Sequence, residues 1–361
     1  MPGIFDYLDW RGDISFSDLG LNEIDNLILS TISYIEFSDI LPTSHHRSLQ
    51  MLTTAKRYLA SRRGEGAYLG VILPAEIVTL FVKASKTQRF GTIRMGGYSS
   101  IVDIENELQF SAVTYHLGNG SIYVSFRGTD DTLVGWKENL NMSFMSPVPA
   151  QIEAAKYLER AAAAFDGDIY VGGHSKGGNL AVYAATKVSP AIQARIKTVY
   201  NNDGPGFSPD FIRGADYLRI TEKIRMLVPQ SSVVGLLLEH GTPYEVVKSS
   251  EAGLWQHYSL SWEVLGSKFI YLNELTHESV RIDQTIKSWL ANMDMKDREA
   301  FVNVIYETLV ATNAATLTDI NSDKLKLVKA WNTLDEDSRA IVIKTVKLLF
   351  KENFKQLRKK K

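Results

Sequence analysis

The stretch DIYVGGHSKGGNLAVYA, residues 168–184, decides the fold of this 361-residue chain. Its first five residues form an apolar run that predicts a buried strand, and residues 177–188 predict a helix. Between them, GHSKG at 173–177 matches the pattern G-x-S-x-G. A serine on a sharp strand-to-helix turn stands above the sheet at the positive end of the helix, which is typical of a nucleophile. We therefore predict that Ser175 is a nucleophile; the alternative is a glycine-rich, phosphate-binding turn in which this serine is incidental.

The surrounding segments predict an α/β protein with a largely parallel sheet. Short runs rich in β-formers alternate with helical patterns, which is typical of a sheet covered by helices on both faces. Strands are expected at 109–117 and 121–126, as a hairpin, and at 168–172, 196–200, 224–228 and 244–248; helices are expected at 25–35, 49–61, 75–84, 149–165 and 177–188; a loop is expected at 62–66. We expect a mostly helical segment at 1–104, an α/β core at 105–275, and a helical subdomain with a basic tail at 276–361.

Composition excludes several classes of protein. The chain has 40 Lys and Arg against 41 Asp and Glu, so bulk charge does not predict nucleic-acid binding. It contains no Cys, which excludes disulfides and thiolate chemistry. Its first residues, MPGIFDYLDWRGD, do not match a secretory signal, and the longest apolar stretch, 67–82, is interrupted by polar residues, so we expect a cytoplasmic location. Neither a metal-ligand spacing nor a nucleotide-binding fingerprint occurs, and no cofactor is expected.

A serine nucleophile needs a base, and the base needs an orienting acid. Asp203 follows the predicted strand 196–200, and open α/β sheets assemble their sites at the carboxyl ends of strands. Asp203 is therefore the candidate acid, although the Asp-Gly-Pro-Gly sequence would equally suit a turn. Glu239 and Asp210 are the competing acids.

The base is expected after the acid, in the order Ser, acid, His. Histidines that precede Ser175 are disfavoured by this order, and the side chain of His174, inside the turn, is expected to point away from the base position. His257 follows the predicted strand 244–248, where the last part of the sheet should deliver the base. His257 is the preferred candidate, and His240 and His277 are the alternatives.

An oxyanion hole requires backbone N–H groups that face the reacting carbonyl. One should come from Lys176, directly after the nucleophile at the start of a helix. The other should come from the loop after the strand at 121–126, where Thr129 is the candidate. The alternative is that Thr129 only caps the next helix.

The motifs resemble a known family. FRGT at 126–129, followed by Trp136 and by GHSKGGNLA at 173–181, is similar to the class 3 lipases of the α/β-hydrolase fold. NDGPGF at 202–207, VPQSS at 228–232 and FDYLDWRGD at 5–13 resemble a bacterial, lipase-like family of unassigned function. The resemblance covers roughly residues 4–265 and implies a lipase-like fold, with Ser175 as nucleophile and Thr129 in the oxyanion hole.

Two positions depart from the lipase pattern. Class 3 lipases place the acid after the strand that corresponds to 224–228, where this chain has Ser231 and Ser232. Either the acid lies one strand earlier, at Asp203, or the triad is incomplete. Lys176 stands where class 3 lipases usually carry Leu, and a cation there would favour an anionic ester.

The C-terminus is basic. Lys344, Lys347, Lys351 and Lys355 are three or four residues apart, which predicts a helix with a cationic stripe. Such a stripe could make weak contact with a membrane surface; the alternative is a final helix packed on the body, with a frayed end at 358–361.

Taken together, the sequence predicts a serine hydrolase that cleaves small-molecule or lipid carboxylic esters through Ser175, His257 and Asp203. The alternatives are a catalytically silent lipase-fold protein that binds lipid or a protein partner, and a serine peptidase or amidase on the same fold.

Overall fold

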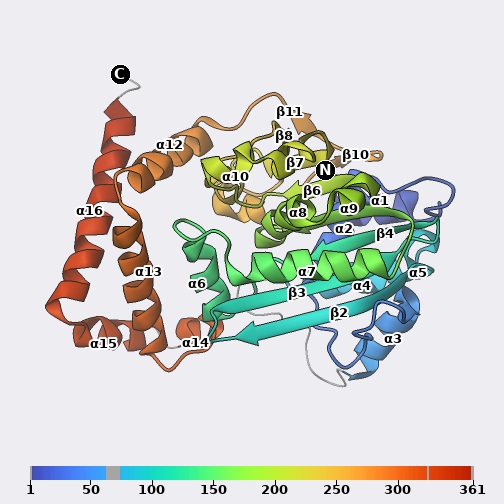
Figure 1. Cartoon of the computed structure of the whole chain (residues 1–361), viewed down its shortest axis with the longest axis horizontal. Helices are drawn as coiled ribbons and strands as arrows, with labels where there is room; N and C mark the ends of the chain where they lie inside the picture. Colours follow the sequence, from blue (N-terminus) through green and yellow to red (C-terminus); the bar gives the residue numbers. More distant parts are fainter. Residues whose placement is uncertain (1, 62–73, 323–324, 359–361) are drawn as a thin grey trace.

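A nine-stranded sheet forms the centre of the computed structural model, which describes residues 2–61, 74–322 and 325–358 (Figure 1). The strands lie in the order β1-β2-β3-β4-β5-β6-β7-β8-β11. Their bounds are β1 (Ser48–Gln50), β2 (Arg94–Asp103), β3 (Leu108–His116), β4 (Ser121–Phe126), β5 (Asp168–His174), β6 (Ile196–Asn202), β7 (Ile224–Pro229), β8 (Tyr244–Val247) and β11 (Tyr271–Leu272). Each pair of neighbours from β4 to β8 is parallel. The pairs from β1 to β4, and the pair of β8 with β11, are antiparallel. The predicted α/β fold class is confirmed.

Helices cover both faces of the sheet because successive apolar side chains of its strands point to opposite faces, so that both faces are apolar. In β4, Ile122 and Val124 pack under α7 (Pro149–Ala163) and α8 (Lys176–Lys187), whereas Tyr123 packs with the N-terminal helices. The first face also carries α6 (Leu133–Asn141), α9 (Pro190–Arg195), α10 (Pro209–Arg213) and α11 (Ala215–Leu218). The other face is covered by α1 (Ile4–Arg11), α2 (Glu23–Ile32), α3 (Met51–Ser61), α4 (Glu76–Ser85) and α5 (Gln88–Gly91).

The N-terminal segment contains two strands, β1 and β2, that the sequence-based prediction did not include. A mostly helical pattern was expected over the first hundred residues, but β2 spans Arg94–Asp103 and pairs along most of β3. That expectation is wrong for β2 because the strand has a weak local signal, with two glycines and two serines, and depends on its neighbour for its hydrogen bonds. The sheet therefore begins before residue 105. The loop predicted at 62–66 lies outside the described residues.

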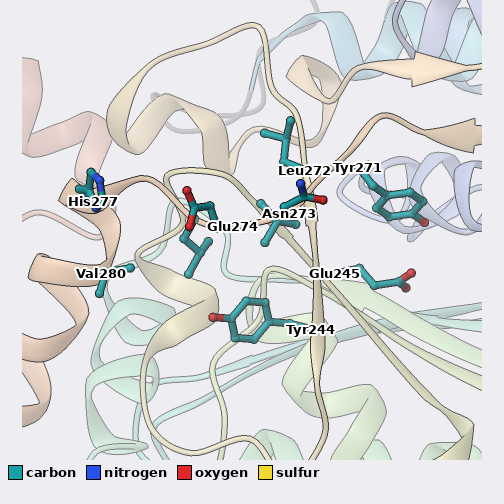
Figure 2. Close-up of a pocket in the computed structure, with 10 residues that line it drawn as sticks. Tyr244, Glu245, Tyr271, Leu272, Asn273, Glu274, His277 and Val280 are labelled. Carbon is teal, nitrogen blue, oxygen red and sulfur yellow. The ribbon is translucent and has the colours of Figure 1, made fainter.

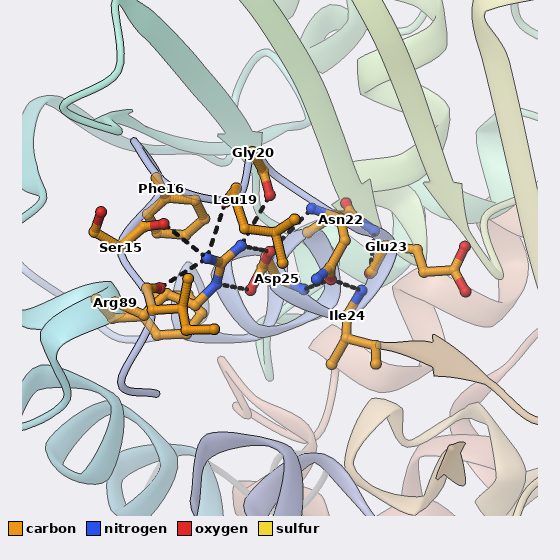
Figure 3. A network of polar contacts seen from close by, with 12 residues as sticks. Ser15, Phe16, Leu19, Gly20, Asn22, Glu23, Ile24, Asp25 and Arg89 are labelled. Atoms are coloured by element: carbon orange, nitrogen blue, oxygen red, sulfur yellow. Dashed lines mark hydrogen bonds and ion pairs between the residues drawn. The ribbon is translucent and has the colours of Figure 1, made fainter. Parts of the chain in front are cut away.

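A buried arginine fixes the N-terminal loop to α2 (Figure 3). The Arg89 guanidinium is fully buried and forms an ion pair of 2.5 Å with Asp25. It also donates to the carbonyl oxygens of Ile14, Leu19 and Gly20, at 2.9–3.0 Å. This one side chain thereby satisfies the carbonyl groups of a loop that has no secondary structure of its own.

The C-terminal helices stand at one end of the molecule, beside α6 (Figure 1). They are α12 (His277–Ala291), α13 (Met295–Val310), α14 (Leu317–Ser322), α15 (Leu325–Thr333) and α16 (Glu336–Arg358). Helix α13 contacts α6 on one side and α16 on the other. Among the helices of the described residues, none has both the length and the apolar character that crossing a bilayer requires.

Candidate active site

Ser175 lies at the turn where β5 ends and α8 begins, as the sequence predicts. Its backbone has φ 58° and ψ −132°, a conformation that non-glycine residues rarely adopt. The Ser175 N–H donates to the Asn202 carbonyl oxygen of β6 at 2.9 Å, which holds the turn in place. A side chain at Gly173 would lie 2.3 Å from the backbone of Gly177, so the motif's glycines allow β5 and α8 to approach this closely.

Asp203 and His257 form a hydrogen-bonded pair, with 2.6 Å between Asp203 Oδ2 and His257 Nδ1. Asp203 follows β6 and is fully buried. Its other oxygen, Oδ1, accepts from Ser232 Oγ at 2.5 Å and from the Gly235 N–H at 3.2 Å. Since a carboxylate only accepts, Nδ1 of His257 carries a proton, and Nε2 is the ring atom left to act as a base.

Ser232, at one of the two positions where the sequence departs from the lipase pattern, is hydrogen-bonded to Asp203. Class 3 lipases carry their acid in this loop after β7, but here Ser232 donates its hydroxyl proton to an acid that comes from the loop after β6. The two loops follow neighbouring parallel strands, so their ends meet at the same edge of the sheet. Asp203, from the loop after β6, thus contacts both Ser232 of the loop after β7 and His257.

One cavity of about 290 Å³ brings the predicted site residues together. Ser175, His257, Thr129 and Lys176 all line it. The rest of its wall is mainly apolar and comes from α6, the 234–238 loop, α12 and α13; it includes Trp136, Leu140, Met142, Val234, Leu237, Leu238, Ile286, Trp289, Leu290, Met293, Phe301 and Val302. The C-terminal helices, outside the resemblance that the sequence carries, thus form part of the wall of this cavity.

Backbone contacts fix the C-terminal segment to the loop that carries Thr129. The Leu133 N–H donates to Ala315 O at 3.0 Å, and the Leu317 N–H donates to Asp131 O at 2.9 Å. Farther along the cavity wall, Arg298 of α13 donates to the Ser143 carbonyl oxygen at 2.6 Å. Main-chain hydrogen bonds therefore tie the start of α14 to the candidate oxyanion loop.

The candidate oxyanion residues line the same cavity as the nucleophile. Lys176 is the first residue of α8, so its backbone N–H has no acceptor within the helix. Thr129 lies in the loop after β4, and its hydroxyl accepts a hydrogen bond from Asn139 of α6. Two elements that flank Ser175 thus contribute to one end of the cavity.

The Lys176 ammonium does not face the cavity. Its Nζ lies 2.8 Å from Glu138 Oε2 and 2.7 Å from the Gln109 carbonyl oxygen, and both charged side chains are fully buried. The expectation that this cation favours an anionic ester is therefore wrong. The long side chain passes under α6 because a buried carboxylate there compensates its charge.

Tyr34 and His174 are two residues of the site whose roles the sequence did not reveal. His174 Nε2 donates to the backbone carbonyl oxygen of His257 at 2.7 Å, and its Nδ1 accepts from the Tyr34 hydroxyl at 2.9 Å. Burial lowers the pKa of His174 to about 3, so the ring is neutral, with its proton on Nε2. Its side chain contacts the backbone of the candidate base and lies 4.6 Å, between ring centroids, from the imidazole of His257.

The alternative residues lie elsewhere. Glu239 is exposed, and its backbone pairs with Phe207. His240 does not line the cavity; burial lowers its pKa to about 4. His277 is exposed at the start of α12, and Asp210 lies in the first turn of α10. The structure does not bring these four residues to Ser175.

A larger hollow of about 440 Å³ lies at the far edge of the sheet, between β8, β11 and the start of α12 (Figure 2). Tyr244, Glu245, Asn273, Glu274 and His277 line it, and it contains neither Ser175 nor His257. It therefore takes no part in chemistry at the nucleophile. Among the described residues, no group of three or more His, Asp or Glu side chains could hold a metal ion.

Comparison with known proteins gives a family and a distant structural likeness. A family model described as Mbeg1-like matches residues 84–307, more than half of the chain. A native Rhizomucor miehei lipase propeptide complex is similar over 57% of this chain and 71% of the lipase chain, with 15% sequence identity and a TM-score of 0.32. No curated protein matches the sequence.

Proposed function

The chain belongs to the Mbeg1-like family, and from the chemistry of its cavity we propose that it is a serine hydrolase of carboxylic esters. The observation that carries the proposal is the 2.6 Å hydrogen bond between Asp203 and His257, with Ser175 in the same cavity. This arrangement of an acid, a base and a serine on a strained turn is the one that activates a hydroxyl group for acyl transfer.

The reaction proceeds in two halves. His257 Nε2 takes the proton of Ser175 Oγ as this oxygen attacks the ester carbonyl, and the N–H groups of Lys176 and Thr129 stabilise the oxyanion. Collapse breaks the ester bond, and His257 returns the proton to the leaving alcohol. Water, deprotonated by the same ring, then attacks the acyl-enzyme, and the proton passes back to Ser175. Asp203 holds the imidazole and stabilises its charged form throughout.

The apolar wall supports an ester whose acyl or alkyl part is hydrocarbon. Trp289, Leu290, Phe301 and Val302 present apolar surface to the cavity, and the Lys176 ammonium is turned away from it. Burial of apolar surface contributes about 25 cal/mol per Å², so hydrocarbon substrates gain binding energy there that charged ones do not.

The experiment that tests the proposal is labelling of the purified protein with a fluorophosphonate probe. We expect labelling of the wild type, none in Ser175→Ala, and a rate lower by about 10³- to 10⁴-fold in Asp203→Asn and His257→Ala. Ser143→Ala is the matched control, since Ser143 lines the same cavity with its hydroxyl bonded to Leu140 O.

Absence of labelling in the wild type would contradict the proposal and favour a lipid-binding or protein-binding role. If labelling is observed, matched nitrophenyl esters and nitroanilides separate an esterase from an amidase: we expect turnover of the esters only.

A further inference from the structure

Helix α16 has one face packed on the protein. Val342, Thr345 and Glu352 are buried along this face. The Trp289 indole N–H of α12 donates to the Thr345 carbonyl oxygen at 3.0 Å, and Ser288 donates to Glu352 at 2.7 Å. These contacts hold α16 in a defined orientation on α12, so the directions of its other sides are also defined.

Another side of α16 carries a stripe of exposed apolar side chains. We call this the α16 stripe; it consists of Ile343, Val346, Phe350, Phe354 and Leu357. Successive members are three or four residues apart, which places all five on one side of the helix. Phe350 and Phe354 are 59% and 62% exposed. Exposed apolar residues are common when scattered singly, but a contiguous stripe with two phenylalanines marks a binding surface.

Lysines lie along one edge of the stripe. Lys344, Lys347, Lys351 and Lys355 are all exposed, and they lie together beside the apolar side chains on the helix surface. Lys344 pairs with Asp297 and Lys355 with Glu352, whereas Lys347 and Lys351 form no ion pair with any residue that the structure describes. Only one acid, Glu352, follows residue 337 in the sequence, and it is buried on the packed face.

Helix α15 repeats this composition. Leu325 and Val328 are exposed, with Lys326 and Lys329 exposed next to them. Helix α16 lies at the outer edge of the molecule, with α15 at its foot (Figure 1). Cations and exposed apolar side chains therefore occur on two successive helices at one end of the protein.

We propose that the α16 stripe and the lysines along its edge bind the surface of an anionic phospholipid bilayer. A helix with apolar side chains on one side and lysines beside them lies in the interface of a membrane, with its apolar residues among the acyl chains and its cations at the phosphates. The lysines favour an anionic membrane over a second copy of the chain as the binding partner. A second copy would place the lysines of two α16 helices near one another, whereas an anionic surface complements their charge.

Helix α16 lies at the outer edge of the molecule, and α13 contacts both α16 and α6 (Figure 1). Trp289 links α16 to the cavity, since its ring lines the cavity while its N–H bonds α16. Binding at α16 would therefore bring the part of the cavity wall that α12 forms close to the lipid. The bilayer proposal does not depend on ester hydrolysis, and its test does not need a catalytic readout.

The test is co-sedimentation of the full chain with vesicles of phosphatidylcholine alone or mixed with phosphatidylglycerol. We expect binding to the mixed vesicles that weakens with added salt, and little binding to phosphatidylcholine. The variants Phe350→Ser/Phe354→Ser and Lys347→Glu/Lys351→Glu should each lower the partition coefficient by about ten-fold or more. Ser175→Ala should bind like the wild type, which separates this proposal from the proposed hydrolase.

Two controls match the variants in chemistry. Leu59→Ser/Ile104→Ser removes two exposed apolar side chains, 50% and 67% exposed, from other elements. Lys86→Glu/Lys268→Glu makes the same change in net charge at two other exposed lysines. Both should bind vesicles as the wild type does, within about two-fold.

Three results would overturn the proposal. They are no binding of the wild type to mixed vesicles, equal loss in the control variants, and a dimer in sedimentation that Phe350→Ser converts to a monomer without any vesicle binding. Far-ultraviolet circular dichroism and urea unfolding of each variant show whether its fold is intact, so that only folded variants are compared.

Discussion

The buried pair formed by Lys176 and Glu138 supports a sharp prediction about stability. Lys176→Met removes the cation and leaves Glu138 with no charged partner in a fully buried position. Glu138 keeps hydrogen bonds from the Ala150 N–H, at 2.7 Å, and from the Gln109 N–H, at 3.1 Å. These neutral donors do not replace an ammonium group, so we expect the folded state to lose stability.

The size of the loss follows from the burial of both groups. Removal of one partner of a buried ion pair costs about 3–5 kcal/mol, because the remaining charge has neither water nor a counter-ion. Methionine matches the length and apolar stem of lysine, so a cavity adds little to this figure. The double variant Lys176→Met/Glu138→Gln removes both charges and should recover most of the loss.

The assay is urea unfolding of the wild type, both single variants and the double variant at neutral pH. A double-mutant cycle gives the coupling between the two residues, which we expect to exceed about 1 kcal/mol. The matched comparison is Lys137→Met, whose partner Glu107 is one-third exposed and therefore hydrated; its loss should be about 1 kcal/mol or less.

Two results would refute this reasoning. One is a loss of unfolding free energy below about 1 kcal/mol for Lys176→Met, and the other is a double variant no more stable than Lys176→Met. The ratio of activity on anionic and neutral esters is a second readout, since the Lys176 ammonium points away from the cavity. That ratio should be unchanged in Lys176→Met. A fall in the ratio would mean that the ammonium reaches the substrate.

Three further predictions concern other parts of the molecule. Arg89→Met should destabilise the fold by about 3–5 kcal/mol in urea unfolding, because it leaves the buried Asp25 unpaired; a loss near zero would contradict the role of this pair. Tyr34→Phe removes the hydroxyl that bonds His174, and should slow fluorophosphonate labelling while lowering stability by only about 0.5–1.5 kcal/mol; unchanged labelling would show that this contact does not position His257. Burial lowers the pKa of His174 to about 3, so between about pH 6.5 and pH 3 the unfolded chain binds a proton at this ring and the folded chain does not. The free energy of unfolding should therefore fall as the pH drops through this range, by up to about 1.4 kcal/mol per pH unit. Urea unfolding across this range should show a shallower slope in His174→Gln than in the wild type, and an equal slope would refute the assignment.

The sequence alone determined what depends on neighbours along the chain. The strand and helix on either side of GHSKG differ in period, and the glycines between them permit a sharp turn, so Ser175 was predictable from one short stretch. Asp203 and His257 could be selected as candidates, because in the order Ser, acid, His the acid and the base follow the nucleophile at the ends of later strands. Their separation of 2.6 Å could not be predicted, since it depends on how the loops after β6 and β8 pack.

Tertiary structure decided what depends on segments far apart in the chain. Tyr34 meets His174 across 140 residues, and Trp289 and Phe301 reach the cavity from helices whose own pattern shows only an apolar face. Lys176 has the same sequence context whether it faces substrate or a buried carboxylate; the position of Glu138 on α6 settles its direction. Periodicity reports which side of an element is apolar, but the partner of that side is chosen by packing and by the compensation of buried charge.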